Sequence, residues 1–137
     1  KGVSAYSKMK STKLNSVTSD TFSAITLRTE KFDTIFLYIS SGCSKIEIFK
    51  YLEKCIDKGR PTAIMGDTNM DFLIECKLNE FLENKGFQQL VQCATRESGS
   101  LIDHIYANEA LRSLDITTEQ CSAYYSDHDV ITISIPK

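Results

Sequence analysis

Three short stretches of the sequence carry side chains that could bind a metal ion or act on a phosphate ester. The first is GDTN at 66–69, which follows an apolar run that ends at Met65. Asp67 and Asn69, two residues apart on an extended backbone, would lie on the same side of the chain. They could then converge on a cation, a nucleophilic water or a phosphate oxygen. The alternative is turn chemistry, in which both side chains cap their own backbone at the end of a strand.

The other two stretches pair an aspartate with a histidine. SLIDHIYAN places Asp103 among apolar residues, where a carboxylate must be exposed, paired or functional, because an isolated buried charge is costly. By alternation along a strand, His104 would face away from Asp103 and have a structural or surface role. SDHD at 126–129 places Asp127 and His128 just before the last apolar run. Histidine is the side chain best suited to proton transfer near neutral pH.

Alternating and helical patterns predict the elements that would position these groups. Their order indicates a layered α/β sandwich on a largely antiparallel plan, with residues 1–137 forming one domain, because no linker or internal repeat is visible. Helices are predicted over 45–58, with Gly59 as the C-terminal cap, and over 74–84. A loop or hairpin end is predicted over 11–20, and strands over 2–7, 21–29, 33–40, 61–65, 87–91, 101–107, 114–118 and 130–135.

Composition limits the class of protein. Hydrophobic residues make up 42% and charged residues 25% of the chain, as in an ordinary soluble domain. No apolar run approaches the roughly 18 residues that span a bilayer, so no membrane partner is expected. The five cysteines are widely spaced and contain no C-x-x-C pair, which favours reduced thiols in an intracellular, nuclear or cytoplasmic protein. The net charge of −2 gives no overall attraction to nucleic acid.

The three stretches, in this order, resemble the G-D-x-N, [IL]-D-[HY] and S-D-H motifs of the endonuclease/exonuclease/phosphatase superfamily, whose members have the DNase I-like fold. TRESGSLIDHIYAN at 95–108 most resembles the endonuclease domains of non-LTR, LINE-type retrotransposons. The resemblance implies a DNase I-like layered α/β (α+β) sandwich. It covers nearly the whole chain but only about the last two-thirds of the expected domain, so the N-terminal strands of the sandwich would be lacking.

The resemblance also implies roles for individual residues. Asp67 would hold or polarise the nucleophilic water, and Asn69 would orient that water and bind a phosphate oxygen. His128 would contact the scissile phosphate, and Asp103 would fix the tautomer of His128. Asp127 would help to bind a metal, Mg²⁺ or Mn²⁺, or would order the site.

Tyr38 matches a strand-end tyrosine of the family that can contact the phosphate, although an ordinary core aromatic is an equal alternative. The family's metal-binding glutamate, commonly in a Gln-Glu pair, has no counterpart. Glu30, the one early acid in a strand-like context, lies in what is predicted to be a hairpin turn.

The expected function is therefore metal-dependent phosphodiester hydrolysis, as in a DNA-nicking endonuclease of a retroelement, with weak or no activity in a chain of this extent. One alternative is a catalytically dead module that binds nucleic acid or protein. Another is a phosphatase of a lipid or a small nucleotide. DNA is the expected partner, and a homodimer or a further N-terminal segment could cover the open sheet.

Overall fold

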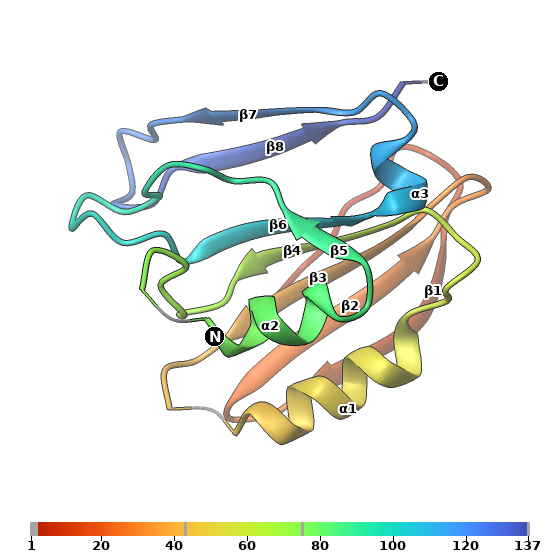
Figure 1. Ribbon diagram of the computed structural model, residues 1–137, viewed down its shortest axis with the longest axis horizontal. Coiled ribbons are helices and arrows are strands. Elements are labelled where there is room, and N and C mark those ends of the chain that lie inside the picture. The colour runs from red at the N-terminus through yellow and green to blue at the C-terminus, as the bar shows by residue number, and fades with distance from the viewer. Residues whose placement is uncertain (1–2, 43, 75, 137) are drawn as a thin grey trace.

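The structure is a computed structural model that describes residues 3–42, 44–74 and 76–136. Its described elements form a mixed α+β fold with one large and one small sheet (Figure 1). In chain order they are β1 (Thr12–Thr18), β2 (Phe22–Arg28), β3 (Asp33–Ile39), α1 (Lys45–Cys55), β4 (Thr62–Asp67), α2 (Lys77–Glu83), β5 (Phe87–Gln89), β6 (Asp103–Asn108), α3 (Glu109–Arg112), β7 (Thr117–Cys121) and β8 (Val130–Ser134).

The large sheet has six strands in the order β1-β2-β3-β4-β6-β5, and β7 and β8 form a separate antiparallel pair. All neighbours in the large sheet are antiparallel except β3 and β4. These two strands are parallel because α1 carries the chain back to the starting end of the sheet between them. The largely antiparallel plan predicted from the sequence is confirmed.

Alternating residues of the central strands separate the two faces of the large sheet. Ile64 on β4 and Tyr106 on β6 belong to the main core, which α1 and α2 cover. Their neighbours in sequence, such as Ala63 and Ile105, point to the opposite face and pack against residues of β8. Figure 1 shows the helices along the large sheet and the β7–β8 pair beyond β6. Asp67 and Asp103 have the same parity as Ala63 and Ile105, so strand alternation places them on the β8 side.

The small sheet covers only part of that second face. Its apolar residues, Ile131 and Ile133, pack with clusters built on β4 and β6. On β2 and β3, several residues of the same face, including Ile25 and Phe36, are half-buried. The prediction that a second copy or a further segment covers this part of the sheet stays a prediction.

Helix α1 forms where an apolar stripe recurs at helical spacing. Ile48 and Leu52, four residues apart, are fully buried in the main core. The helix ends at Cys55, three residues before the predicted end, because Ile56 turns to an extended backbone while its N–H still bonds to the Leu52 carbonyl. The predicted glycine cap is therefore wrong.

Two predictions near the N-terminus are also wrong. Residues 3–7 form no strand, and Gly2 lies outside the described residues. The predicted loop at 11–20 instead contains β1, which pairs with β2 along its length. Its sequence is polar because it is an edge strand on which Val17 alone packs against the main core.

Three further boundaries moved because turns occupy the predicted ends. Helix α2 begins at Lys77, three residues after the predicted start at Ile74, which instead closes a tight turn through its N–H and the Asp71 carbonyl. The predicted strand at 114–118 starts at Thr117, after the unpredicted helix α3 and the left-handed Asp115. Strand β5 ends at Gln89, whose side chain bonds to the backbone of Val91.

Across residues 3–42, 44–74 and 76–136, the helices are too short and too polar to cross a bilayer. Cys55, Cys76, Cys93 and Cys121 are free thiols, as predicted, and Cys43 lies outside the described residues.

Candidate active site

Asp67 is the last residue of β4, which lies between β3 and β6 in the large sheet. In the sheet register it pairs with Tyr38 on β3 and with Asp103 on β6. The residue before it, Gly66, has φ 145, and a Cβ atom there would lie 1.8 Å from the carbonyl oxygen of Leu37. Glycine is therefore required where β4 approaches β3, one residue before the carboxylate. Tyr38 is half-buried and lies on the same face as Asp67. Its contact with a phosphate stays a prediction.

The turn after Asp67 differs from the extended backbone assumed in the sequence argument. Asn69 adopts a left-handed φ of 52, and its N–H donates to Asp67 Oδ1 at 3.1 Å. This is an Asx turn, the alternative considered for GDTN. The Asn69 side-chain amide donates to the carbonyl of Ile39 at the end of β3. Asn69 is thus held beside Asp67 by the turn and by β3, and its role toward water or phosphate stays a prediction.

Thr68 is buried and faces away from Asp67. Its N–H and its hydroxyl both donate to the Ile102 carbonyl, at 2.8 and 3.0 Å. Beneath it lies His104, which is fully buried. The Leu101 carbonyl accepts from Nε2 of His104 at 3.0 Å, so Nδ1 accepts from the Tyr106 hydroxyl. Burial lowers the pKa of His104 despite these hydrogen bonds, which keeps the ring neutral. His104 has the structural role predicted for it.

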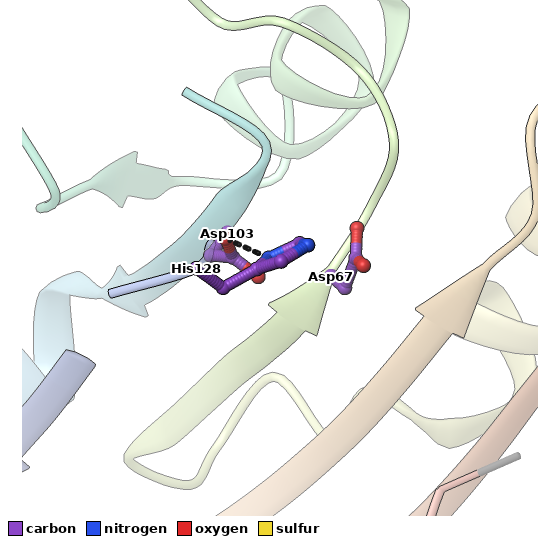
Figure 2. Close-up of side chains that lie close together, drawn as sticks. All are labelled: Asp67, Asp103 and His128. Atoms are coloured by element: carbon purple, nitrogen blue, oxygen red, sulfur yellow. Dashed lines mark hydrogen bonds and ion pairs between the residues drawn. The ribbon is translucent and has the colours of Figure 1, made fainter. Parts of the chain in front are cut away.

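Asp103 and His128 form the contact at the centre of the site. Asp103, the first residue of β6, is 8% exposed, and its Oδ2 accepts from His128 Nδ1 at 2.8 Å. This bond assigns the proton to Nδ1 and leaves Nε2 as the nitrogen that Figure 2 shows turned towards Asp67. One ligand atom from each of Asp67, Asp103 and His128 lies within 4.8 Å of the others. The structure therefore brings together three of the residues predicted from the sequence.

Thr95 joins the segments that carry Asp103 and His128, a role that sequence reasoning missed. Its buried hydroxyl accepts from the backbone N–H groups of Ile102 and Asp103, at 3.2 and 3.1 Å. Its own carbonyl accepts from the N–H of Asp129 at 2.6 Å. The signal was present in the Thr-Arg pair that contributes to the family resemblance, but a hydroxyl that bonds seven and eight residues away has no local pattern.

Arg96 is the second residue without a predicted role. Its backbone forms a bridge with His128, and its guanidinium donates to Asp127. The hydrogen bond from Arg96 lowers the pKa of the Asp127 carboxyl, and the same bond raises the pKa of Arg96. Asp127 Oδ1 lies 3.9 Å from His128 Nε2. Asp127 is thus next to the cluster, in an ion pair, and its role as a metal ligand stays a prediction.

The donor set fits a divalent cation. Two carboxylates, from Asp67 and Asp103, provide the oxygen ligands that Mg²⁺ and Mn²⁺ prefer, and water would complete the coordination shell. His128 adds an imidazole that is already oriented by Asp103. Of the two carboxylates, Asp103 is the more buried, and its neighbour His128 balances its charge when protonated.

Three solved structures resemble this chain in fold. The endonuclease domain of TRAS1, a telomere-specific non-LTR retrotransposon, matches 93% of this chain and 67% of its own length, with 17% identity and a TM-score of 0.72. An endonuclease/exonuclease/phosphatase family protein from Leptotrichia buccalis matches 85% of this chain and 53% of its own, with 18% identity and a TM-score of 0.58.

The third is the Haemophilus ducreyi cytolethal distending toxin, which matches 93% of this chain and 58% of its own length, with 14% identity and a TM-score of 0.62. No family model and no curated protein sequence matches the chain. The likeness therefore rests on backbone structure, and the chain corresponds to roughly half to two-thirds of each of these proteins. The chain therefore has the fold of these three proteins, which is the DNase I-like fold that its ordered motifs predict.

Proposed function

We propose that this chain carries the hydrolytic site of a metal-dependent phosphodiesterase that nicks DNA, as in a retroelement endonuclease. The observation that carries the proposal is the Asp103–His128 hydrogen bond beside Asp67 at the end of β4. A histidine oriented by a buried carboxylate, next to a second carboxylate, suits in-line attack of water on phosphorus. The similar TRAS1 domain is described as the endonuclease of a retrotransposon, which supports DNA as the substrate.

Each residue would have a separate part in the reaction. Asp67 would hold the attacking water and accept its proton. His128, with Nδ1 held by Asp103, would take up a second proton on Nε2, and this N–H would donate to a phosphate oxygen and stabilise the negative charge that develops there. A divalent cation bound at Asp67 and Asp103, with Asp127 as the further ligand that the sequence predicts, would supply further charge stabilisation at the phosphate. Asn69, fixed by the Ile39 carbonyl, would contact a phosphate oxygen.

A second candidate function is nucleic-acid or protein binding without catalysis. The observation in its favour is the Arg96–Asp127 ion pair, because Arg96 competes with a cation for the carboxylate expected to bind metal. Because the metal ion would then bind weakly, we propose that hydrolysis of DNA by this chain is slow.

Nicking of supercoiled plasmid in Mg²⁺, in Mn²⁺ and in EDTA tests the proposal. We expect slow nicking that needs the metal, and a loss of at least about 100-fold in Asp67→Ala and in His128→Ala. Glu30→Ala is the matched control, because it removes an exposed carboxylate from the β2–β3 hairpin, at the other end of the strands from Asp67.

Each result separates the candidates. Nicking that survives in both site variants would place the activity elsewhere and refute the proposal. Plasmid binding without nicking, equal in Mg²⁺ and in EDTA, would favour the second candidate. Hydrolysis of a lipid or small-nucleotide phosphate, with no nicking, would change the substrate class while keeping the site.

A further inference from the structure

The loop that leads to His128 carries two strongly exposed tyrosines. Tyr124 is 100% exposed and Tyr125 is 75% exposed. Their rings pack edge to face, with centroids 5.4 Å apart and an interplanar angle of 87°. Aromatic side chains have a large apolar area that is normally buried in a core or an interface. These two rings lie outside the core clusters of the described residues, so they add little to the folded state.

The backbone of this loop fixes the tyrosines close to the active site. The N–H of Ser126 bonds to the Ala123 carbonyl at 3.2 Å and closes a turn around both tyrosines. The Ser126 hydroxyl then accepts from the N–H of His128 at 3.1 Å. Tyr125 is three residues from His128, a separation of at most about 11 Å along an extended chain. With a rise of about 3.4 Å per nucleotide, the Cα atom of Tyr125 is within about three nucleotides of His128.

The charges around the loop favour a neutral, flat ligand. The Asp127 carboxylate is half exposed beside Tyr125. Glu97 is exposed, and its N–H bonds to the Asp127 carbonyl, so a second acid lies along the same edge. Arg96 balances the charge of Asp127, so these three residues carry one net negative charge, which opposes the approach of an anionic lipid surface. A nucleobase is itself uncharged and stacks on an aromatic ring whatever its sequence, so the tyrosines would contact the base while its phosphates lie away from the acids.

We propose that Tyr124 and Tyr125 form a stacking platform for an unpaired nucleobase next to the phosphate held at His128. This rests on the proposed function and narrows it to nucleic acid that is single-stranded, or locally opened, at the cleaved bond. Within a paired duplex the faces of the bases are already stacked on one another. The tyrosines would therefore select sites where a base is accessible.

Binding to two oligomers of equal charge tests the platform separately from catalysis. One is fluorescein-labelled oligo(dT) and the other is an abasic oligomer with the same number of phosphates, both measured by fluorescence anisotropy in EDTA. We expect the chain to bind oligo(dT) about tenfold more tightly than the abasic oligomer. The double variant Tyr124→Ala/Tyr125→Ala should lose this preference, and Tyr124→Phe/Tyr125→Phe should keep it. Tyr6→Ala is the control, because Tyr6 is 98% exposed but lies outside the loop.

Each outcome of the binding experiment either supports or overturns the stacking platform. Equal affinity for the two oligomers, or a preference that survives in the double alanine variant, overturns the platform. Tyrosine-dependent binding to phosphatidylcholine/phosphatidylserine vesicles without a base preference also overturns it, in favour of a lipid surface. A base preference that depends on the tyrosines, in a chain that nicks no plasmid, supports the platform and refutes the proposed catalysis.

Discussion

The Asp103–His128 pair shows how two side chains 25 residues apart define the chemistry of this site. Asp103 is buried at the start of β6, so its carboxylate holds the imidazole at a fixed angle. The hydrogen bond from Nδ1 also selects the tautomer, because a neutral ring with Nδ1 protonated must accept at Nε2. Asp103 therefore has two expected parts, because it lies within reach of a cation at Asp67 and it positions His128.

Asp103→Asn should separate positioning from binding. The asparagine amide can donate to Nδ1 and favour the wrong tautomer of His128, so we expect the maximal nicking rate to fall about 10- to 100-fold. The KM for plasmid should change less than twofold, since the phosphate contacts are kept. Steady-state kinetics with circular dichroism as a folding control will measure this, and a rise in KM with an unchanged maximal rate would contradict it.

The sequence predicted the members of this site better than their contacts. Asp67 follows an apolar run and His128 shortly precedes one, so their positions beside strands could be read directly, whereas Asp103 was predicted inside the strand over 101–107 and is the first residue of β6. The left-handed turn at Asn69 could not, because an Asx turn and an extended strand suit the same residue types. The Arg96–Asp127 pair joins segments 31 residues apart, and no local pattern encodes such a contact.

Among the helices and strands, those with buried apolar residues were predicted from the sequence more accurately than exposed ones. Strand β3 and helix α1 place apolar residues at the spacing of their type, and both were predicted. Strand β1 is an edge strand with polar residues, so hydrophobic alternation could not reveal it. Its partner β2 specifies it through backbone hydrogen bonds, which any sequence without proline can make.

Gly66→Ala tests the close approach of β4 to β3. The new Cβ would overlap the Leu37 carbonyl at a backbone φ of 145, so we expect a loss of about 3 kcal/mol or more in the free energy of unfolding. Gly59→Ala is the matched control, because the nearest atom to a Cβ there is 3.7 Å away. Urea unfolding will compare them, and equal midpoints for the two variants would contradict the expectation.

Thr95→Val tests the hydrogen bonds between the Thr95 hydroxyl and the backbone at the start of β6. The variant keeps the side-chain shape but leaves the buried N–H groups of Ile102 and Asp103 without their acceptor. We expect a loss of about 1–3 kcal/mol in stability together with slower nicking, because Asp103 loses its support. Thr95→Ser retains the hydroxyl and should restore most of both. Unchanged stability and nicking in the valine variant, or failure of the serine variant to restore either, would contradict this role for the hydroxyl.

At the scale of the whole molecule, a second polar cluster ties together the end of the sheet where β3 begins. Asp33 is buried and accepts from Arg28 on β2 and from Arg60 before β4, at 2.9 Å each. Arg60 also donates to the Thr29 carbonyl. Burial raises the pKa of Asp33, but the hydrogen bonds from both arginines outweigh it, so the pKa lies below its ordinary value of 3.8.

This shift predicts how stability depends on pH. A carboxyl with a lowered pKa in the folded state stabilises the fold above its unfolded pKa, and this contribution is lost as the pH falls below about 4 through the folded pKa. Asp33→Asn should therefore be less stable than the natural chain at pH 7, with a smaller loss on going to pH 3. Thermal unfolding across this range will measure the difference. Parallel stability curves for the two proteins would contradict the prediction.

The separate β7–β8 pair gives the site a particular dynamic property. These two strands hydrogen-bond to each other, and they are held to the large sheet by apolar side chains and by the Arg96–His128 bridge. The pair is therefore a unit that can open locally, with its amide protons exchanging before those of the central strands. Such an opening would carry His128 away and leave Asp67 and Asp103 in place, so the site would lose its imidazole while the rest of the fold stayed intact.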